Sequence, residues 1–290
     1  VWTVPGRGNR PLGIKPPNPV PLDRTRTDAH CAFCARLYLD TPPEKARLVK
    51  TDDKYITLRH LLADAVFDTV AEFRRLPNLF EIISFDYWRK NFGYRLPDAV
   101  ELHKRNYLAS ESGRQHVLRM SEQRLKAAGF DESAWERMSV DERLQFANAF
   151  FGGGHELIVA RRHFIDGATH DDQLASSGTL TPEEHYQYLR FTIDAMRDIY
   201  VNNRYVRYVA VFQNWLKPAG ASFDHLHKQL VAIDERGNQN EMELQRVRAN
   251  PNLYNEAAIN FAAYRNLVVA ENDYAIAYAG FGHRFPTLEI

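Results

Sequence analysis

Two apolar runs in the second half of the chain have the alternating pattern of β-strands. Residues 206–213 are rich in Val, Tyr and Phe, a Pro-Ala-Gly turn follows, and a second run spans residues 225–233. Alternate side chains of a strand share one face, so His225, His227 and Gln229 are predicted to point the same way. The two runs therefore predict strands that carry a polar face.

Further strands and one helix are predicted upstream. Residues 46–58 predict a hairpin with an Asp-Asp turn, and residues 155–160 predict a strand entered through the flexible glycines 152–154. From Leu58 to Phe73, apolar residues recur at steps of three and four, which predicts a helix.

Helices are predicted in the middle of the chain and after the two late strands. The charged, Leu- and Met-containing residues 85–150 predict several helices, one of them over residues 114–128. The tetrapeptide Thr181–Glu184 is a strong start signal, because Thr can cap the helix, Pro suits its first turn and Glu can reach back to the cap. That helix is predicted to end near Tyr200, and residues 239–265 are also predicted to be helical.

Small and polar residues gather between the two late strands. Asn214, Gly220 and Ser222 precede His225 and His227. Glycine lets a backbone approach a ligand closely, serine is a small donor, and imidazole is nucleophilic near neutral pH. A His-x-His pair alone is often two histidines on a half-solvated strand. The neighbouring polar residues favour a phosphate site instead.

This combination resembles the galactose-1-phosphate uridylyltransferase branch of the histidine-triad superfamily, whose signature is Asn, then Gly-x-Ser, then His-x-His-x-Gln. Asn214, the tripeptide 220–222 and the segment 225–229 occupy those positions at the family's spacing. The uridylyltransferases usually have Pro, Pro and a small residue where this chain has Asp224, Leu226 and Lys228. Glutamine in place of a third histidine is typical of nucleotidyl transfer rather than hydrolysis.

The resemblance implies an α+β fold, with an antiparallel sheet of the histidine-triad (HIT) kind and helices packed on one face. Residues 1–265 are then expected to form one uridylyltransferase-like domain with a helical insertion at about residues 85–150. Residues 266–290 are expected to begin a second, incomplete HIT-like half, because residues 267–274 are similar to residues 48–55.

Cys31 and Cys34 are separated by two residues, a spacing that lets both thiolates face one metal ion. Alone, the pair fits a redox motif or two buried thiols equally well. The family combines such a pair with two histidines, one after a strand of the His-Glu-Val-Ile-Val type and one at the start of His-x-His. The resemblance therefore implies that His163 and His225 complete a structural Zn²⁺ site.

Three more residues are implied to hold the substrate. In the family, an Arg-x-x-Arg-Pro sequence near the N-terminus contacts the nucleotide phosphates, and Arg7 and Arg10 match it. Guanidinium groups suit phosphate oxygens, although the Pro- and Gly-rich residues 1–22 could also be a solvated arm. Asn78 matches a family residue whose amide contacts the nucleoside; otherwise it is a turn residue after Pro77.

By the same resemblance, His227 attacks the α-phosphorus of a nucleotide sugar, releases a sugar 1-phosphate and passes the nucleotidyl group to a second phosphate-bearing acceptor. Gln229 and Ser222 bond the phosphoryl oxygens, and Asn214 and Gly220 contact the substrate. UDP-hexose, ADP-glucose and dinucleoside polyphosphates stay open as substrates. The alternatives are a zinc-stabilised nucleotide-binding protein without turnover and a dinucleoside polyphosphate phosphorylase or hydrolase.

Composition narrows the class of protein further. With 290 residues, 44% hydrophobic and 26% charged, the chain is typical of globular proteins. Its 37 basic and 37 acidic side chains balance, which argues against a broad nucleic-acid surface. No apolar run is long enough for a membrane span, and two cysteines cannot form a disulfide framework. We expect a cytoplasmic protein that can form a homodimer and binds neither nucleic acid nor membrane.

Overall fold

The computed structural model describes the chain apart from residues 1–2, 6–17, 53, 217–218, 281–286 and 290. The chain divides into two compact units. The larger unit contains residues 14–235, and the smaller unit contains residues 1–13 and 236–290. Each unit has its own antiparallel sheet.

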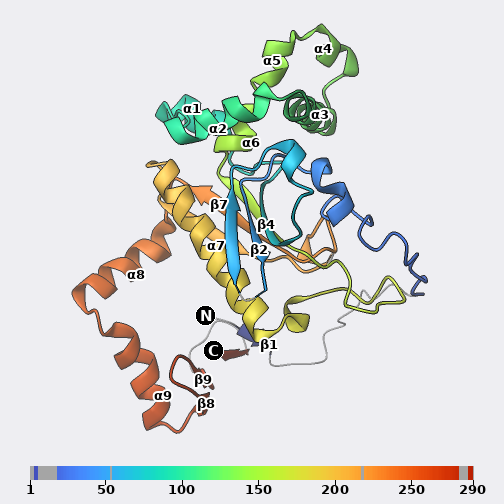
Figure 1. Cartoon of the computed structure of the whole chain (residues 1–290). Helices are drawn as coiled ribbons and strands as arrows, with labels where there is room; N and C mark the ends of the chain where they lie inside the picture. Colours follow the sequence, from blue (N-terminus) through green and yellow to red (C-terminus); the bar gives the residue numbers. More distant parts are fainter. Residues whose placement is uncertain (1–2, 6–17, 53, 217–218, 281–286, 290) are drawn as a thin grey trace. The chain divides into compact units, whose positions relative to one another are not determined.

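The larger unit is built on a six-stranded antiparallel sheet (Figure 1). Its strands are β2 (Ala46–Lys50), β3 (Tyr55–Arg59), β4 (Ala71–Pro77), β5 (His155–Ala160), β6 (Tyr208–Phe212) and β7 (His227–Ile233). Their order across the sheet is β3-β2-β4-β5-β7-β6, and all neighbours are antiparallel. The predicted α+β class with an antiparallel sheet is confirmed.

Helix α7 (Pro182–Asn202) covers one face of this sheet (Figure 1). Its start has the predicted capping box: the Thr181 side chain accepts the Glu184 N–H, and the Glu184 carboxylate accepts the Thr181 N–H. Tyr188 and Phe191 of α7 are buried in the main core with Leu230 of β7. Burial of this apolar stripe is what holds the helix on the sheet.

The residues between β4 and β5 form a helical insertion at one end of the sheet (Figure 1). Its helices are α1 (Phe85–Phe92), α2 (Asp98–Ala109), α3 (Glu111–Ala127), α4 (Glu132–Arg137), α5 (Val140–Leu144) and α6 (Ala147–Gly152). The insertion has a buried cluster of its own that includes Tyr107, Met120 and Phe150. The predicted helical character of residues 85–150 is confirmed.

The helix predicted over residues 58–73 is wrong. The segment comprises the end of β3, a loop with one 3₁₀ turn at Ala63–Ala65, and the start of β4. The buried guanidinium of Arg47 donates to the Val66 and Thr69 carbonyls, each at 2.7 Å, and so bonds these oxygens outside any helix. The apolar steps of three and four come from two strand ends and a loop, which periodicity alone cannot distinguish from a helix.

The glycines before β5 serve close packing rather than the predicted flexibility. A Cβ on Gly154 would lie 2.7 Å from the Cβ of Ala232. A Cβ on Gly153 would lie 2.4 Å from the backbone carbonyl oxygen of Ala149. Neither distance is compatible with a side chain larger than hydrogen, so these positions exclude other residues by contact.

The smaller unit contains a four-stranded sheet in the order β1-β10-β9-β8. These strands are β1 (Thr3–Pro5), β8 (Val268–Glu271), β9 (Ile276–Tyr278) and β10 (Thr287–Glu289). Helix α8 (Gly237–Ala249), a π-helical turn (Asn255–Ile259) and α9 (Asn260–Tyr264) precede β8, as predicted for residues 239–265. That residues 266–290 begin a second HIT-like half stays a prediction. Within the described parts of both units, each helix is too short or too polar to cross a bilayer.

Lys228 of β7 carries a buried charge on the face of the sheet that α7 covers. Its Nζ lies 3.4 Å from the centroid of the Tyr188 ring and has no hydrogen-bond partner among the described residues. Desolvation of the ammonium lowers the pKa of Lys228 to about 8. The ring face offsets only part of this desolvation cost, so the charge destabilises the folded state.

We expect Lys228→Met to stabilise the protein by up to roughly 3 kcal/mol at pH 7, from the lowered pKa at about 1.4 kcal/mol per pKa unit. The unfolded state holds this proton more tightly than the folded state, so the wild type carries the full cost below pH 8 and loses it as the pH rises toward 10.5. Urea unfolding at pH 7 and pH 10 measures both effects. Lys54→Met, at an exposed position, is the matched control. Equal stability of wild type and Lys228→Met at pH 7 would contradict the burial argument.

Candidate active site and metal centre

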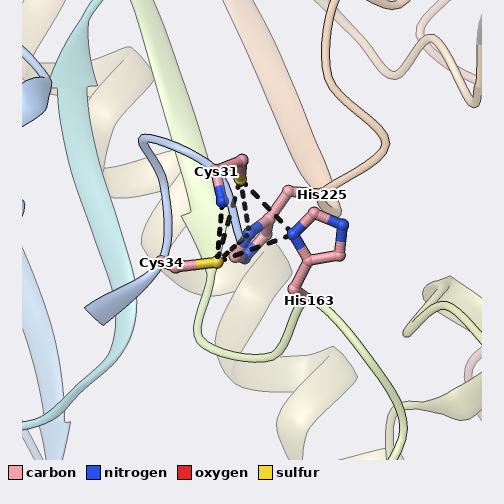
Figure 2. Close-up of side chains that lie close together, drawn as sticks. All are labelled: Cys31, Cys34, His163 and His225. Carbon is pink, nitrogen blue, oxygen red and sulfur yellow. Dashed lines mark hydrogen bonds between the residues drawn. The ribbon is translucent and has the colours of Figure 1, made fainter. Parts of the chain in front are cut away.

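The four side chains predicted to bind a metal converge in the larger unit. Cys31 and Cys34 come from the loop before β2, His163 follows β5, and His225 precedes β7. Figure 2 shows their sulfur atoms and imidazole rings pointing toward one another. One ligand atom from each residue lies within 4.8 Å of all the others. The cluster therefore suits a metal ion.

The separations match those of a tetrahedral zinc site. The two sulfur atoms are 3.8 Å apart. Cys31 Sγ lies 3.3 and 3.5 Å from the Nδ1 atoms of His163 and His225, and Cys34 Sγ lies 3.6 and 3.9 Å from the same atoms. Tetrahedral zinc with ordinary bond lengths places its ligands about 3.8 Å apart for two sulfurs and about 3.6 Å apart for sulfur and nitrogen. The donor set fits the ion, and zinc as its identity stays a prediction.

A backbone carbonyl orients one of the two histidine ligands. The Nε2–H of His225 donates to the carbonyl of Ala160, the last residue of β5, at 2.6 Å. The neutral ring then leaves Nδ1 unprotonated and directed at the cysteines, which is the usual outer-shell arrangement of a metal-binding histidine. His163 is held by ring contacts with His30 and Phe164.

The charges of the cluster also favour a cation. The hydrogen bond from Cys31 lowers the pKa of the Cys34 thiol, and contacts with the two histidines lower it further. The same bond, burial and repulsion by the neighbouring Cys34 thiolate raise the pKa of Cys31. Burial lowers the pKa of His163, which favours the neutral form that binds metals. A divalent cation would let both thiols ionise.

His227 opens β7 next to the metal cluster. Its Nδ1–H donates to the His225 carbonyl at 2.7 Å, so Nε2 carries the free lone pair. Nε2 has no hydrogen-bond partner in the described part of the chain. Phe33, between the two cysteines, packs edge-on against the ring with 5.5 Å between centroids. Burial lowers the pKa of His227 and keeps its imidazole neutral at pH 7.

The strand predicted to begin at His225 begins at His227. The Leu226 carbonyl accepts the Ala160 N–H at 3.0 Å, but the Ala160 carbonyl is taken by the His225 side chain. The imidazole thus replaces a backbone N–H as the partner of the Ala160 carbonyl, and the regular ladder starts at His227.

His227 and Gln229 share the face of the sheet that is opposite α7, because Lys228 between them contacts α7. The Oε1 atom of Gln229 lies 3.0 Å from Nε2 of His155. The Nδ2 atom of Asn78 lies 3.1 Å from the same nitrogen. Gln229 and Asn78, which were predicted from separate segments, therefore both contact His155, a residue that the sequence analysis did not single out. The alternation of β5 puts His155 on the same face as Leu157, but only the pairing of Leu157 with Gln229 in the folded sheet brings that face to the site.

The structure gives fewer contacts for the remaining predicted residues. Asn214, Gly220 and Ser222 lie in the loop between β6 and β7. Gly220 has φ 85°, and a Cβ there would lie 3.9 Å from Asn214 Nδ2, so these two residues are neighbours. Ser222 is exposed. Arg7 and Arg10 lie outside the described residues. The roles of all five stay predictions.

A family model described as "Domain of unknown function (DUF4921)" matches residues 1–290. Two solved structures from Arabidopsis thaliana are similar to the chain. One is an ADP-glucose phosphorylase with bound ADP-glucose (15% identity, TM-score 0.46), and the other is a GalT-like protein (16% identity, TM-score 0.47).

These likenesses cover a larger share of this chain than of the other two. They cover 87% and 89% of this chain and 55% and 58% of the solved ones, so the chain spans somewhat more than half the length of each. A comparison with curated proteins gives no match.

Proposed function

We propose that this chain, which belongs to the DUF4921 family, is a nucleotidyltransferase that forms a covalent nucleotidyl-histidine at His227. The observation that carries the proposal is the 2.7 Å hydrogen bond from Nδ1 to the His225 carbonyl. It leaves Nε2 as the nucleophilic atom of the ring and fixes the direction of its lone pair. His225 itself is directed at the cysteines, so the two histidines have separate tasks.

In the first step, Nε2 of His227 attacks the α-phosphorus of a nucleotide sugar. The N–P bond forms while the P–O bond to the sugar phosphate breaks, and the electron pair of the broken bond leaves with the sugar 1-phosphate. The ring becomes cationic, and its Nδ1–H bond to the His225 carbonyl stabilises that charge. A phosphate-bearing acceptor then attacks the same phosphorus, and His227 leaves as a neutral imidazole.

The surrounding residues have supporting tasks in this proposal. The Gln229 amide and the Ser222 hydroxyl donate to the phosphoryl oxygens, where negative charge increases during transfer. Asn78, Asn214 and Gly220 contact the nucleotide. Cys31, Cys34, His163 and His225 would hold a zinc ion with four protein ligands and no open position. The ion would then anchor the His225 carbonyl rather than take part in the reaction.

Isotope exchange tests the proposal. With a covalent intermediate, the protein should transfer label from glucose 1-phosphate into UDP-glucose or ADP-glucose with no other acceptor present, because the first step is reversible by itself. A dinucleoside tetraphosphate is the third donor to compare. Release of nucleoside monophosphate without exchange would indicate a hydrolase. Donor binding without exchange or release would indicate the nucleotide-binding protein without turnover.

A further inference from the structure

His155, the first residue of β5, is a buried meeting point of three segments. His155 is only 2% exposed. The Ile82 N–H lies 3.2 Å from Nδ1, whereas Gln229 Oε1 and Asn78 Nδ2 lie 3.0 and 3.1 Å from Nε2. Nothing in the transfer steps described above uses this ring. Its contacts nevertheless reach two residues of the proposed site.

The contacts determine which ring nitrogen carries the proton. A backbone N–H can only donate, so Nδ1 of His155 accepts from Ile82. The neutral ring therefore carries its hydrogen on Nε2, and burial lowers the pKa of His155 and so favours this neutral form. Of the two atoms near Nε2, Gln229 Oε1 is an acceptor and Asn78 Nδ2 is a donor. The Nε2–H of His155 is thus directed to Gln229.

This bond has a consequence for the Gln229 amide. With Oε1 bound to His155, the NH₂ group points away from it and has no hydrogen-bond partner among the described residues. An amide rotated by half a turn would offer its oxygen instead, and an oxygen repels phosphoryl oxygens. The orientation of this single amide therefore decides whether Gln229 helps or hinders phosphoryl transfer.

We propose that His155 is a positioning residue, which holds the Gln229 amide so that its NH₂ group faces the phosphoryl oxygens of the bound nucleotide. The inference rests on the proposed function. It assigns His155 no contact with the substrate and lets it act only through Gln229.

Two substitutions separate this role from a structural one. In His155→Gln, the side-chain NH₂ can take the place of Nε2–H and still donate to Gln229, whereas the acceptor for the Ile82 N–H is lost. In His155→Asn, the side-chain oxygen can take the place of Nδ1 and keep the Ile82 contact, whereas the donor to Gln229 is lost. Thermal unfolding of both variants checks that each is folded.

We expect His155→Gln to keep kcat within a few-fold of wild type. His155→Asn should lower kcat about ten- to hundred-fold, because the misoriented Gln229 amide then loses its hydrogen bond to a charged phosphoryl oxygen. KM should change little, because the contact strengthens as charge develops on phosphorus. The opposite ranking, or equal losses in the two variants, would show that His155 serves the Ile82 loop and would overturn the inference.

A double-mutant cycle adds a test that fold stability does not affect. Once Gln229→Met has removed the amide, His155→Asn should lower transfer no further, because its effect passes through Gln229. Effects that multiply in the double variant would mean that the two residues act independently, which contradicts the inference.

Nitrogen NMR of the ¹⁵N-histidine-labelled wild type gives a readout that needs no turnover. His155 should be protonated at Nε2 and not at Nδ1, and Gln229→Met should speed the exchange of that proton with water. Protonation at Nδ1 would reject the inference even in an active enzyme. A wild type that has the expected tautomer but shows no isotope exchange would instead reject the proposed function, and with it the role of His155 in transfer.

Discussion

Replacing His227 with alanine should abolish nucleotidyl transfer and leave the metal cluster in place. In the proposed mechanism Nε2 is the atom that bonds to phosphorus. The other imidazole beside Gln229, that of His155, has both of its ring nitrogens in contact with protein groups. Loss of a nucleophile of this kind costs on the order of 10⁴-fold or more in rate. Isotope exchange and steady-state kinetics with the same donor measure the loss, and elemental analysis measures the metal.

The metal is expected to stay because His227 contributes only an N–H to the cluster's neighbourhood, through the His225 carbonyl. His170→Ala is a suitable control, since His170 bonds Thr169 rather than any site residue. Full exchange activity in His227→Ala would assign the chemistry to another group. A metal-free His227→Ala would mean that the ring is needed for the cluster and that the lost activity cannot be read as loss of a nucleophile.

Replacing Cys34 with serine should empty the metal site and destabilise the larger unit. The four ligands tie together the loop at residues 31–34, the end of β5 and the start of β7. A closed zinc site contributes its binding free energy to folding, on the order of 10 kcal/mol in small zinc peptides, so losing one ligand should cost several kcal/mol. We expect metal content to fall from about one ion per chain to near zero.

Chelation of the wild type should reproduce the destabilisation, and added zinc should reverse it. Transfer should fall as well, because the His225 carbonyl that orients His227 moves with its side chain. A Cys34→Ser protein that keeps one ion per chain and its full stability would contradict the site. So would a wild type in which Cys31 and Cys34 form a disulfide.

The four residues of the metal cluster could be predicted from the sequence, three of them because they lie in local patterns. Cys31 and Cys34 have the spacing of a metal-binding knuckle, and His225 opens a His-x-His pair. His163 was the least obvious member, since only the resemblance linked a histidine three residues beyond β5 to cysteines 132 and 129 residues away. The structure brings all four within reach of one ion.

The elements that could not be predicted depend on contacts between distant segments. The loop after β3 is held by Arg47, whose own sequence neighbourhood says nothing about carbonyls at Val66 and Thr69. The sequence indicates only that His155 is the first residue of a buried strand. Its place beside Gln229 follows from the strand pairing, which sets Leu157 opposite Gln229. In both cases a side chain forms hydrogen bonds with residues far away in the sequence. Such long-range partners produce no periodic pattern from which they could be predicted.

The position of a covalent label on the wild-type protein tests the central claim most directly. The protein is incubated with nucleotide sugar labelled in the α-phosphate, denatured in base and mapped by peptide mass spectrometry. The account predicts label on His227, in a phosphoramidate bond that survives base and breaks in acid. Label on another residue, or none while isotope exchange proceeds, would contradict it.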